Sequence, residues 1–407
     1  MRCGLLGKKL GHSYSPQIHS HLGSYSYELF EKAPEELESF LRSSAYTGLN
    51  VTMPYKKDVL PYLDELSDRA AALGAVNTIV RRDDGTLIGH NTDYFGFSSM
   101  LAKTGLRVTG KKVLVLGSGG ASVTAVAVLQ SLDANVIVVS RNGTNNYDNL
   151  QIHADASVIV NTTPVGMYPN TGVSPVDLSL FPCLEGVLDV IYNPARTQLL
   201  LDAEERGLVT ENGLWMLVAQ AKESAEWFTG TKIDDNKIAQ IHDILRRQME
   251  NIVLIGMPGC GKSTIGKLLA EQLGKTFVDA DQEIVTLAVS SIPEIFATSG
   301  ESGFRQYETT VLEQLGKQSG LVIATGGGCV TKPVNLPLLH QNGRIIWLQR
   351  ALSVLPTEGR PLSQANKLEE MYAIRKPLYE SFADFVVNND GETQHTVQEI
   401  MEKVGSQ

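Results

Sequence analysis

A glycine-rich loop with a lysine is the clearest chemical signal in the 407-residue sequence. It fits the pattern G-x-x-x-x-G-K-[ST], and it lies between a β-branched run and a stretch that favours a helix. In such a loop the backbone N–H groups surround phosphate oxygens, the lysine reaches the β- and γ-phosphates, and the serine hydroxyl can ligate Mg²⁺. The sequence therefore predicts an ATP site made of Gly256, Met257, Pro258, Gly259, Cys260, Gly261, Lys262, Ser263 and Thr264.

Two carboxylates follow this loop. The segment FVDAD at 277–281 presents Asp279 and Asp281, which lie on one face if the strand stays extended. Asp279 could position Mg²⁺ through water, together with Ser263, and Asp281 could accept the proton of a substrate hydroxyl. We therefore predict that Ser263 and Asp279 form the metal side of the site and that Asp281 is catalytic.

Two arginines and a triglycine turn could hold the substrate of this kinase. Arg305 and Glu308 fall on one face of a predicted helix, Gly326 to Gly328 follow the predicted strand 321–324, and Arg375 precedes a Lys-Pro pair. Guanidinium groups bind carboxylates through paired hydrogen bonds. These residues favour a small acceptor that carries a carboxylate.

The order of the motifs GMPGCGKST, FVDAD, FRQYE, ATGGG, GRPL and RKPLY resembles that of shikimate kinase, from residue 251 to the end. The resemblance implies that ATP phosphorylates the 3-hydroxyl of shikimate and that Arg360 is a lid arginine on the transferring phosphate. It also implies that shikimate is held by Asp281, Arg305, Gly326, Gly327, Gly328 and Arg375. A kinase for a similar small acid, such as gluconate, is the alternative.

A second glycine turn, GSGGAS, follows the predicted strand 113–116. It fits the dinucleotide fingerprint only loosely, because Ser122 stands where the third glycine of GxGxxG would be. The next predicted strand ends at Ser140, and Arg141 follows it. A guanidinium group at this place suits the 2′-phosphate of NADP, whereas NAD would favour a carboxylate.

Hydroxyls, amides, one lysine and one aspartate precede this turn in the segments GHSYSP, NVTMPYK, GAVNT and NTD. Ser13 and Ser15 share one side if their segment is extended. Together these groups suit a small polyol carboxylate. A hydride that leaves a carbinol carbon requires the hydroxyl proton to be taken up, and Lys56, oriented by Asp93, could do this.

These segments, with TTPVGM, IYNPART and MLVAQA farther along, resemble shikimate dehydrogenase from residue 1 to about 249. The resemblance implies NADPH-dependent reduction of 3-dehydroshikimate, with Lys56 and Asp93 catalytic. The substrate contacts that it implies are Ser13, Ser15, Thr52, Asn77, Asp93, Tyr192 and Gln220. The NADP contacts are Gly117, Ser118, Gly119, Gly120, Ala121, Ser140, Arg141, Thr163, Gly213 and Met216. A quinate-type polyol dehydrogenase and a non-catalytic sensor are the alternatives.

The elements that must position these residues are those of an α/β protein, in which strands alternate with helices around parallel sheets. We predict a substrate lobe at 1–100, completed by helices from about 214–249, a Rossmann-like NADP lobe at 101–213, and a P-loop kinase domain of the nucleoside-monophosphate-kinase type at 250–407. The chain between Arg141 and Thr162 is shorter than is usual in the family. We therefore expect a helix and a strand of the NADP lobe to be reduced.

Composition narrows the classes of partner. The formal net charge of -10 disfavours a nucleic-acid partner, which would need clustered lysine and arginine. The longest apolar runs have the length of strands, so we expect no membrane span. Four cysteines without CxxC spacing favour a reducing cytoplasm. We infer a cytoplasmic bifunctional enzyme that acts on 3-dehydroshikimate and shikimate with NADP(H), ATP and Mg²⁺; its oligomeric state is not predicted.

Overall fold

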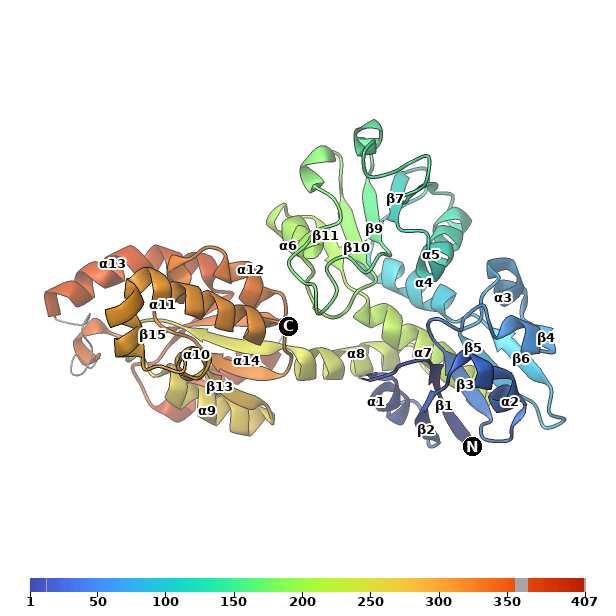
Figure 1. Cartoon of the computed structure of the whole chain (residues 1–407), viewed down its shortest axis with the longest axis horizontal. Coiled ribbons are helices and arrows are strands. Elements are labelled where there is room, and N and C mark those ends of the chain that lie inside the picture. Colours follow the sequence, from blue (N-terminus) through green and yellow to red (C-terminus); the bar gives the residue numbers. More distant parts are fainter. Residues whose placement is uncertain (12, 356–364, 406–407) are drawn as a thin grey trace. The chain divides into compact units, whose positions relative to one another are not determined.

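Three β-sheets, each accompanied by helices, organise the computed structural model, which describes residues 1–11, 13–355 and 365–405 (Figure 1). The chain divides into two units. The first comprises residues 1–165, 173–192 and 199–244, and the second comprises residues 166–172, 193–198 and 245–407. No helix of the described residues is long and apolar enough to cross a membrane.

The first sheet is mixed, with strand order β2-β1-β3-β5-β6-β4. Strands β1, β2 and β3 are parallel, and β5 runs antiparallel to both β3 and β6. The carboxyl end of β3 therefore lies beside the start of β5, which brings the chain after residue 51 close to residue 77. The elements of this part are β1 (Arg2–Gly7), α1 (Ser15–Ser20), β2 (Ser26–Glu31), α2 (Leu37–Arg42), β3 (Gly48–Val51), β4 (Glu65–Leu66), α3 (Asp68–Leu73), β5 (Thr78–Arg81) and β6 (Leu87–His90).

The second sheet is parallel throughout, in the order β11-β10-β9-β7-β8. Its inner strands are buried and rich in valine, as is usual when helices cover both faces of a parallel sheet. The elements are α4 (Asp93–Thr104), β7 (Lys112–Leu116), α5 (Gly120–Ser131), β8 (Asn135–Val139), β9 (Val158–Asn161), β10 (Gly186–Asp189), α6 (Gln198–Glu205), β11 (Val209–Glu211) and α7 (Leu214–Thr229). Helices α4 and α7 pack against each other.

The predicted reduction after Arg141 is confirmed. Between β8 and β9, a stretch that the structure describes throughout, the chain forms a short 3₁₀ turn at Leu150–His153 and no α-helix. Strand β8 is the edge strand of its sheet.

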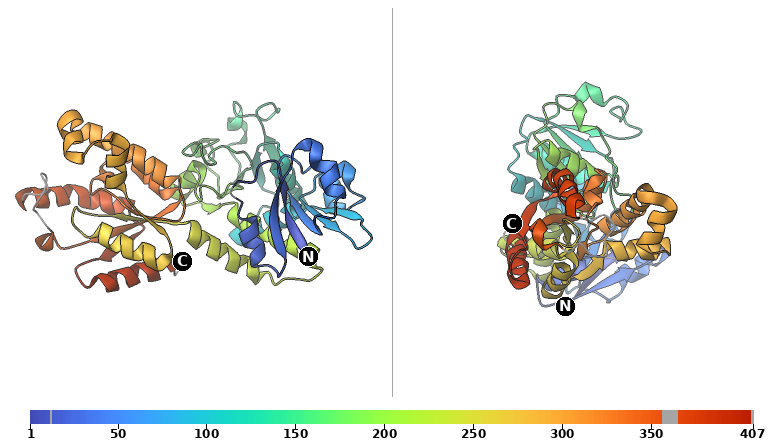
Figure 2. Two further views of the ribbon diagram at one scale, coloured as in Figure 1. Left: turned by 60° about the horizontal axis from the view of Figure 1, so that its bottom comes forward. Right: turned by 90° about the vertical axis from the view of Figure 1, so that its left-hand side faces the viewer.

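The third sheet lies in the second unit and is also parallel, in the order β13-β14-β12-β15-β16. Helices α9 and α14 lie side by side on one face, and α11 and α12 lie together on the other (Figures 1 and 2). The elements are β12 (Asn251–Ile255), α9 (Lys262–Leu273), β13 (Thr276–Asp279), α10 (Ala280–Ala288), α11 (Ile292–Gly316), β14 (Leu321–Ala324), α12 (Asn335–His340), β15 (Gly343–Gln349), α13 (Ala365–Phe382), β16 (Phe385–Asn388) and α14 (Thr393–Gly405). The predicted fold class, a two-lobe α/β part followed by a P-loop kinase domain, is confirmed.

Helix α8 (Asn236–Met249) joins these parts of the chain. Its residues up to 244 belong to the first unit and those from 245 to the second. Only Glu250 separates α8 from β12. The ammonium group of Lys275 donates hydrogen bonds to the carbonyl oxygens of Arg247, Gln248 and Glu250, at 2.7, 3.1 and 2.7 Å. The last turn of α8 is thereby fixed within the second unit.

Candidate active sites

A lysine and an aspartate meet in the first unit. Nζ of Lys56 lies 2.6 Å from Oδ2 of Asp93, and the two side chains are 28% and 14% exposed. Lys56 lies in the turn after β3, where its carbonyl oxygen accepts a hydrogen bond from the N–H of Val76. Asp93 is in the first turn of α4, where the helix dipole favours a negative charge. The structure thus brings together the two groups that the sequence predicts to be catalytic.

Two carboxamides lie close to this pair. Oδ1 of Asn77 accepts a hydrogen bond from the backbone N–H of Thr92 at 2.7 Å, and Nδ2 of Asn77 lies 3.4 Å from Oε1 of Gln220. Asn77 directly precedes β5, Thr92 directly precedes α4, and Gln220 is on α7. Residues that are far apart in the sequence therefore assemble one polar surface. Thr92 lies within the NTD motif but was not predicted as a site residue.

The two serines do not lie on an extended segment, so that expectation is wrong. Ser15 is the first residue of α1, and its N–H donates a hydrogen bond to Oγ of Ser13 at 3.2 Å. The serine hydroxyl offers a local hydrogen bond that competes with an extended backbone. Thr52 follows β3, and its N–H donates a hydrogen bond to the carbonyl oxygen of Leu6. Tyr192 packs edge-on against Tyr14, and burial raises the pKa of its hydroxyl.

The first glycine turn joins β7 to α5. Gly117 has φ +106°, and a Cβ atom there would lie 2.9 Å from Oγ1 of Thr162. At Gly119 and Gly120 an added Cβ would meet no atom of the described residues within 4 Å. The outer side of this turn is therefore open at the N-terminus of a 12-residue helix, which suits the pyrophosphate of a dinucleotide. Ser118 is exposed beside them, and Ala121 is half-buried in the first turn of α5.

The other predicted NADP residues surround the carboxyl ends of the same sheet. Ser140 and the exposed Arg141 follow β8, and the N–H of Ser140 donates a hydrogen bond to the carbonyl oxygen of Asn145. Thr163 follows β9 and donates its hydroxyl hydrogen to Oδ1 of Asn161. Gly213 is the N-cap residue of α7, which carries Met216, and a Cβ at Gly213 would overlap the carbonyl oxygen of Val190. These positions fit a dinucleotide along the carboxyl edge of the sheet.

In the second unit, the phosphate-binding loop joins β12 to α9. Gly256, Gly259 and Gly261 have φ of +141°, +85° and +101°, a region that favours glycine. The ammonium group of Lys262 donates hydrogen bonds to the carbonyl oxygens of Gly256 and Met257, at 2.9 and 3.1 Å. The loop thus has the backbone that its sequence predicts, with the lysine folded over it.

Asn389, just after β16, supports this loop from behind. Its Nδ2 donates a hydrogen bond to the carbonyl oxygen of Cys260 at 2.7 Å, and a Cβ at Gly261 would lie 2.6 Å from the same nitrogen. No local pattern in the sequence points to Asn389, because 129 positions separate it from Cys260.

Asp279 and Asp281 do not share a strand face, so the expectation of an extended segment is wrong here too. β13 ends at Asp279, whose Oδ1 accepts a hydrogen bond from the N–H of Asp281 and so caps α10. Its Oδ2 accepts a hydrogen bond from the hydroxyl of Ser263 at 2.7 Å. Ser263 and Asp279 are therefore adjacent, as a Mg²⁺ site that is completed by phosphate oxygens and water would require. Among the described residues, no cluster of three or more histidine, cysteine or acidic side chains could hold a metal.

Arginines and carboxylates surround the triglycine turn after β14. Nη1 of Arg305 donates to Oε2 of the fully buried Glu308 at 2.7 Å, and burial raises the pKa of Glu308 while Arg305 opposes that shift. A Cβ at Gly326 would lie 2.8 Å from both Oδ1 of Asp281 and Oε1 of Glu308, and one at Gly328 would overlap the Arg305 guanidinium.

On the other side of the turn, Nη1 of Arg375 donates a hydrogen bond to the carbonyl oxygen of Gly327 at 3.1 Å. The structure therefore groups all the described residues that the sequence predicts for the kinase substrate. Arg360 lies outside the described residues.

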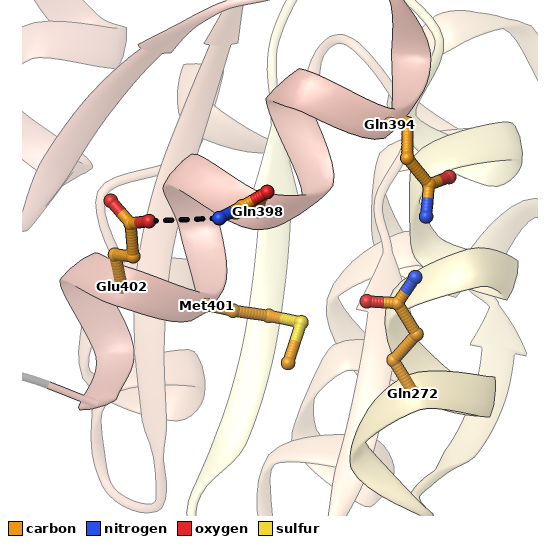
Figure 3. A pocket seen from close by; sticks show the side chains of 5 residues that line it. All are labelled: Gln272, Gln394, Gln398, Met401 and Glu402. Carbon is orange, nitrogen blue, oxygen red and sulfur yellow. Dashed lines mark hydrogen bonds between the residues drawn. The ribbon is translucent and has the colours of Figure 1, made fainter.

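A cavity of about 370 Å³ lies elsewhere in the second unit, between α9 and α14 (Figure 3). Met401 points into it, and the hydrogen-bonded pair Gln398 and Glu402 forms one side. The lining residues are Gln272, Gln394, Gln398, Met401 and Glu402. None of them is a predicted site residue, so the chemistry of the predicted sites does not extend to this cavity.

Comparisons with known proteins find two families. A family model described as shikimate kinase matches residues 258–405, and one described as shikimate dehydrogenase substrate binding domain matches residues 5–79. The shikimate dehydrogenase (NADP(+)) of Clostridium perfringens (strain SM101 / Type A) is 36% identical over 265 residues, which cover 60% of this chain and 97% of that protein.

Solved structures agree with the dehydrogenase part of this result. Shikimate dehydrogenase 1 from Peptoclostridium difficile is 38% identical with a TM-score of 0.56, over 60% of this chain and 97% of that one. Shikimate 5-dehydrogenase from Thermus thermophilus, in complex with NADP(H) and shikimate, is 31% identical with a TM-score of 0.55, over 60% and 98% of the two chains.

Proposed function

Because the chain belongs to the shikimate dehydrogenase family over 60% of its length and carries a shikimate kinase domain at 258–405, we propose that it catalyses two consecutive reactions. The first is reduction of 3-dehydroshikimate to shikimate with NADPH, and the second is phosphorylation of shikimate by ATP with Mg²⁺. The observation that carries the proposal is that one chain assembles both the Lys56–Asp93 pair and the complete phosphate-binding loop. The chain is thus a bifunctional enzyme of the shikimate pathway.

In the dehydrogenase reaction, bound NADPH would supply the hydride for the carbonyl carbon. Nζ of Lys56 donates a proton to the carbonyl oxygen, which becomes the new hydroxyl, and Asp93, 2.6 Å away, orients the ammonium group. The amides of Asn77 and Gln220 bind ring hydroxyls beside this pair. Ser13, Ser15, Thr52 and Tyr192 complete the substrate contacts, and the serine hydroxyls suit the carboxylate.

The NADPH contacts follow the carboxyl edge of the second sheet. The open turn at Gly119 and Gly120 binds the pyrophosphate at the N-terminus of α5, where the helix dipole favours an anion. Arg141 binds the 2′-phosphate and so favours NADP over NAD. Gly213 and Met216 lie at the nicotinamide end.

In the kinase reaction, the oxygen of the shikimate 3-hydroxyl attacks the γ-phosphorus of ATP, and ADP leaves. A carboxylate oxygen of Asp281 accepts the proton of that hydroxyl. Arg305 and Arg375 bind the shikimate carboxylate. The ammonium group of Lys262 leaves the loop carbonyls and binds the phosphate oxygens, where it offsets negative charge. Ser263 and Asp279, in contact at 2.7 Å, would hold Mg²⁺, which would offset charge on the phosphates.

One incubation tests both reactions. The full chain receives 3-dehydroshikimate, NADPH, ATP and Mg²⁺, and the product is identified by mass. Shikimate 3-phosphate is expected from the unsubstituted chain, unreacted 3-dehydroshikimate from Lys56→Ala, and shikimate from Lys262→Ala. Formation of shikimate alone by the unsubstituted chain would refute the kinase assignment. Two further incubations test the enzymatic alternatives. Oxidation of quinate by NADP⁺ is compared with oxidation of shikimate by NADP⁺, and ADP release with gluconate is compared with ADP release with shikimate. Faster turnover of quinate or gluconate would replace shikimate as the substrate of that half.

A further inference from the structure

A buried hydroxyl on α7 contacts residues that lie next to the amides which the proposed function places around the substrate ring. Ser224 has no exposed surface and follows Gln220 by one helical turn. Its Oγ donates a hydrogen bond to the carbonyl oxygen of Gln220 at 2.9 Å and accepts one from Nδ2 of Asn50 at 2.7 Å. It also lies 2.8 Å from Oγ1 of Thr78 and 3.0 Å from Oγ1 of Thr92.

The number of partners constrains the direction of these hydrogen bonds. A serine hydroxyl has one hydrogen to donate and two lone pairs to accept. The hydrogen goes to the carbonyl oxygen of Gln220, and one lone pair accepts from Asn50. The remaining lone pair accepts from a threonine hydroxyl, and the geometry admits either Thr78 or Thr92 in this place.

Asn50 is oriented from its other end. Its Oδ1 accepts the hydroxyl hydrogen of Tyr27 at 2.7 Å, so its Nδ2 must face Ser224. Asn50 itself is 5% exposed. The same Nδ2 also lies 3.4 Å from the carbonyl oxygen of Asn77 and 3.2 Å from Oγ1 of Thr78, so Ser224, at 2.7 Å, is the shortest of its three contacts. A buried amide hydrogen without an acceptor costs free energy, so this contact favours the orientation in which Asn50 faces Ser224.

Ser224 acts on the substrate surface through Thr92. When Oγ1 of Thr92 donates its hydrogen to Ser224, its lone pairs are left to accept from Nδ2 of Asn77 at 3.0 Å. Oδ1 of Asn77 is held by the N–H of Thr92, so the Asn77 amide keeps one orientation. The same amide lies 3.4 Å from Oε1 of Gln220.

We propose that Ser224 is a positioning residue of the dehydrogenase site. Through Thr92 it orients the Asn77 amide toward the ring hydroxyls, and through Asn77 it orients Oε1 of Gln220, whose Nε2 donates to the carbonyl oxygen of Leu217 at 2.8 Å. The inference rests on the proposed function, because it takes these two amides as substrate contacts. Ser224 itself touches neither substrate nor cofactor. Its contribution is to binding of the ring, and the proton transfer at Lys56 does not depend on it.

The test is Ser224→Ala in the full chain. We expect the KM for 3-dehydroshikimate to rise about tenfold, with kcat changed less than twofold and the KM for NADPH unchanged, because an interaction equal in ground and transition states is lost. Ser224→Thr, which keeps the hydroxyl, should restore most of the KM. The matched control is Thr229→Ala, which removes a hydroxyl bound to the carbonyl oxygen of Ala225 on the same helix. It should leave all three constants unchanged.

A double-mutant cycle separates positioning from a merely structural role. In a Gln220→Ala background, Ser224→Ala should raise the KM by less than threefold, because one of the two amides that it positions is gone. A full tenfold rise in that background, an equal rise in the KM for NADPH, or a fall in kcat alone would overturn the inference. An unsubstituted chain that fails to reduce 3-dehydroshikimate would refute the proposed function itself, whereas an active chain that tolerates Ser224→Ala would refute only the inference.

Discussion

The two glycine turns, one in each unit, begin alike and differ in how they are supported. Each follows an inner parallel strand, β7 or β12, and opens a 12-residue helix, α5 or α9. The turn after β7 has one glycine at positive φ and an open outer side at Gly119 and Gly120. The loop after β12 has three glycines at positive φ and is held from behind by Asn389.

The difference explains why one motif is specific and the other is not. In the kinase loop, a Cβ at Gly256 would lie 2.5 Å from the carbonyl oxygen of Leu348, and one at Gly261 would meet Asn389, so backbone angle and space both demand glycine. At Gly119 no atom of the described chain makes that demand. A sequence pattern is specific for its ligand where the folded protein itself requires glycine at each position. It is less specific where only contact with the ligand would require glycine.

The largest expected effect separates the two units and comes from one lysine in each, Lys262 and Lys56. Lys262→Ala removes the cation that faces the phosphates, and we expect kinase activity to fall about a thousandfold, as for other lost charge-stabilising groups. Dehydrogenase activity of the same protein, measured as NADPH oxidation, should stay within twofold. Lys56→Ala should give the reciprocal pattern. Loss of both activities in either variant would contradict the separation of the two sites.

Alanine at a glycine of each turn tests the role of support. Gly261→Ala places a Cβ at φ +101° and against Asn389, so we expect about a hundredfold loss of kinase activity and a lower unfolding temperature. Gly119→Ala, at φ -83°, should leave the unfolding temperature unchanged and raise the KM for NADPH about tenfold. The measurements are steady-state kinetics and thermal unfolding. Equal destabilisation by both substitutions would show that the first turn is constrained as tightly as the second.

The first unit should also lose stability at acid pH, because it contains buried histidines with lowered pKa. His19 stacks on Tyr27, and burial lowers its pKa to about 3; burial lowers the pKa of His90 to about 4. Since the folded-state pKa lies below the unfolded value of about 6.5, the unfolded chain binds protons first as the pH falls. Stability is therefore complete above about pH 6.5 and is lost toward acid, by about 2 kcal/mol for each histidine at about pH 5.

Denaturant unfolding at about pH 7 and about pH 5 measures this loss. Trp347→Phe leaves Trp215 and Trp227, both in the first unit, as fluorescent reporters. In that background, His19→Gln should reduce the difference between the two pH values by about 2 kcal/mol, the share of one histidine. His21→Gln changes an exposed neighbour and serves as the control. An unaltered pH difference in the His19 variant would disprove this account.

The smallest expected effect concerns two residues other than glycine at positive φ, one in each unit. Val289, at φ +50° and 91% exposed, follows α10, and Asp133, at φ +57°, lies after α5. A β-branched residue is strained in this region, whereas aspartate tolerates it. Val289→Gly should stabilise the protein by about 1 kcal/mol, and Asp133→Gly by no more than a few tenths. Hydrogen exchange of peptides from each unit would measure the two, and a larger gain at Asp133 would reverse the argument.

Local patterns predicted the strands, the glycine turns and the residues in motifs, because neighbours in the sequence decide them. They failed where a side chain bonds its own backbone: Asp279 caps α10 and Ser13 binds the N–H of Ser15, and neither segment is extended. Local patterns gave no prediction for residues whose hydrogen-bond partner is far away in the sequence. Ser224 and Asn50 are 174 positions apart, and only the folded chain makes them neighbours.

Helix α8 determines where the chain can be cut to give a separate kinase fragment. A kinase fragment that starts at Asn251, the first residue of β12, would lose Arg247, Gln248 and Glu250, and with them all three carbonyl acceptors of Lys275. Burial lowers the pKa of that ammonium group to about 8, and in the fragment none of these three acceptors would remain. A separable kinase should therefore start no later than Leu245, inside a helix whose first half serves the other enzyme. The boundary between the two enzymes thus falls inside a shared helix and not in a linker.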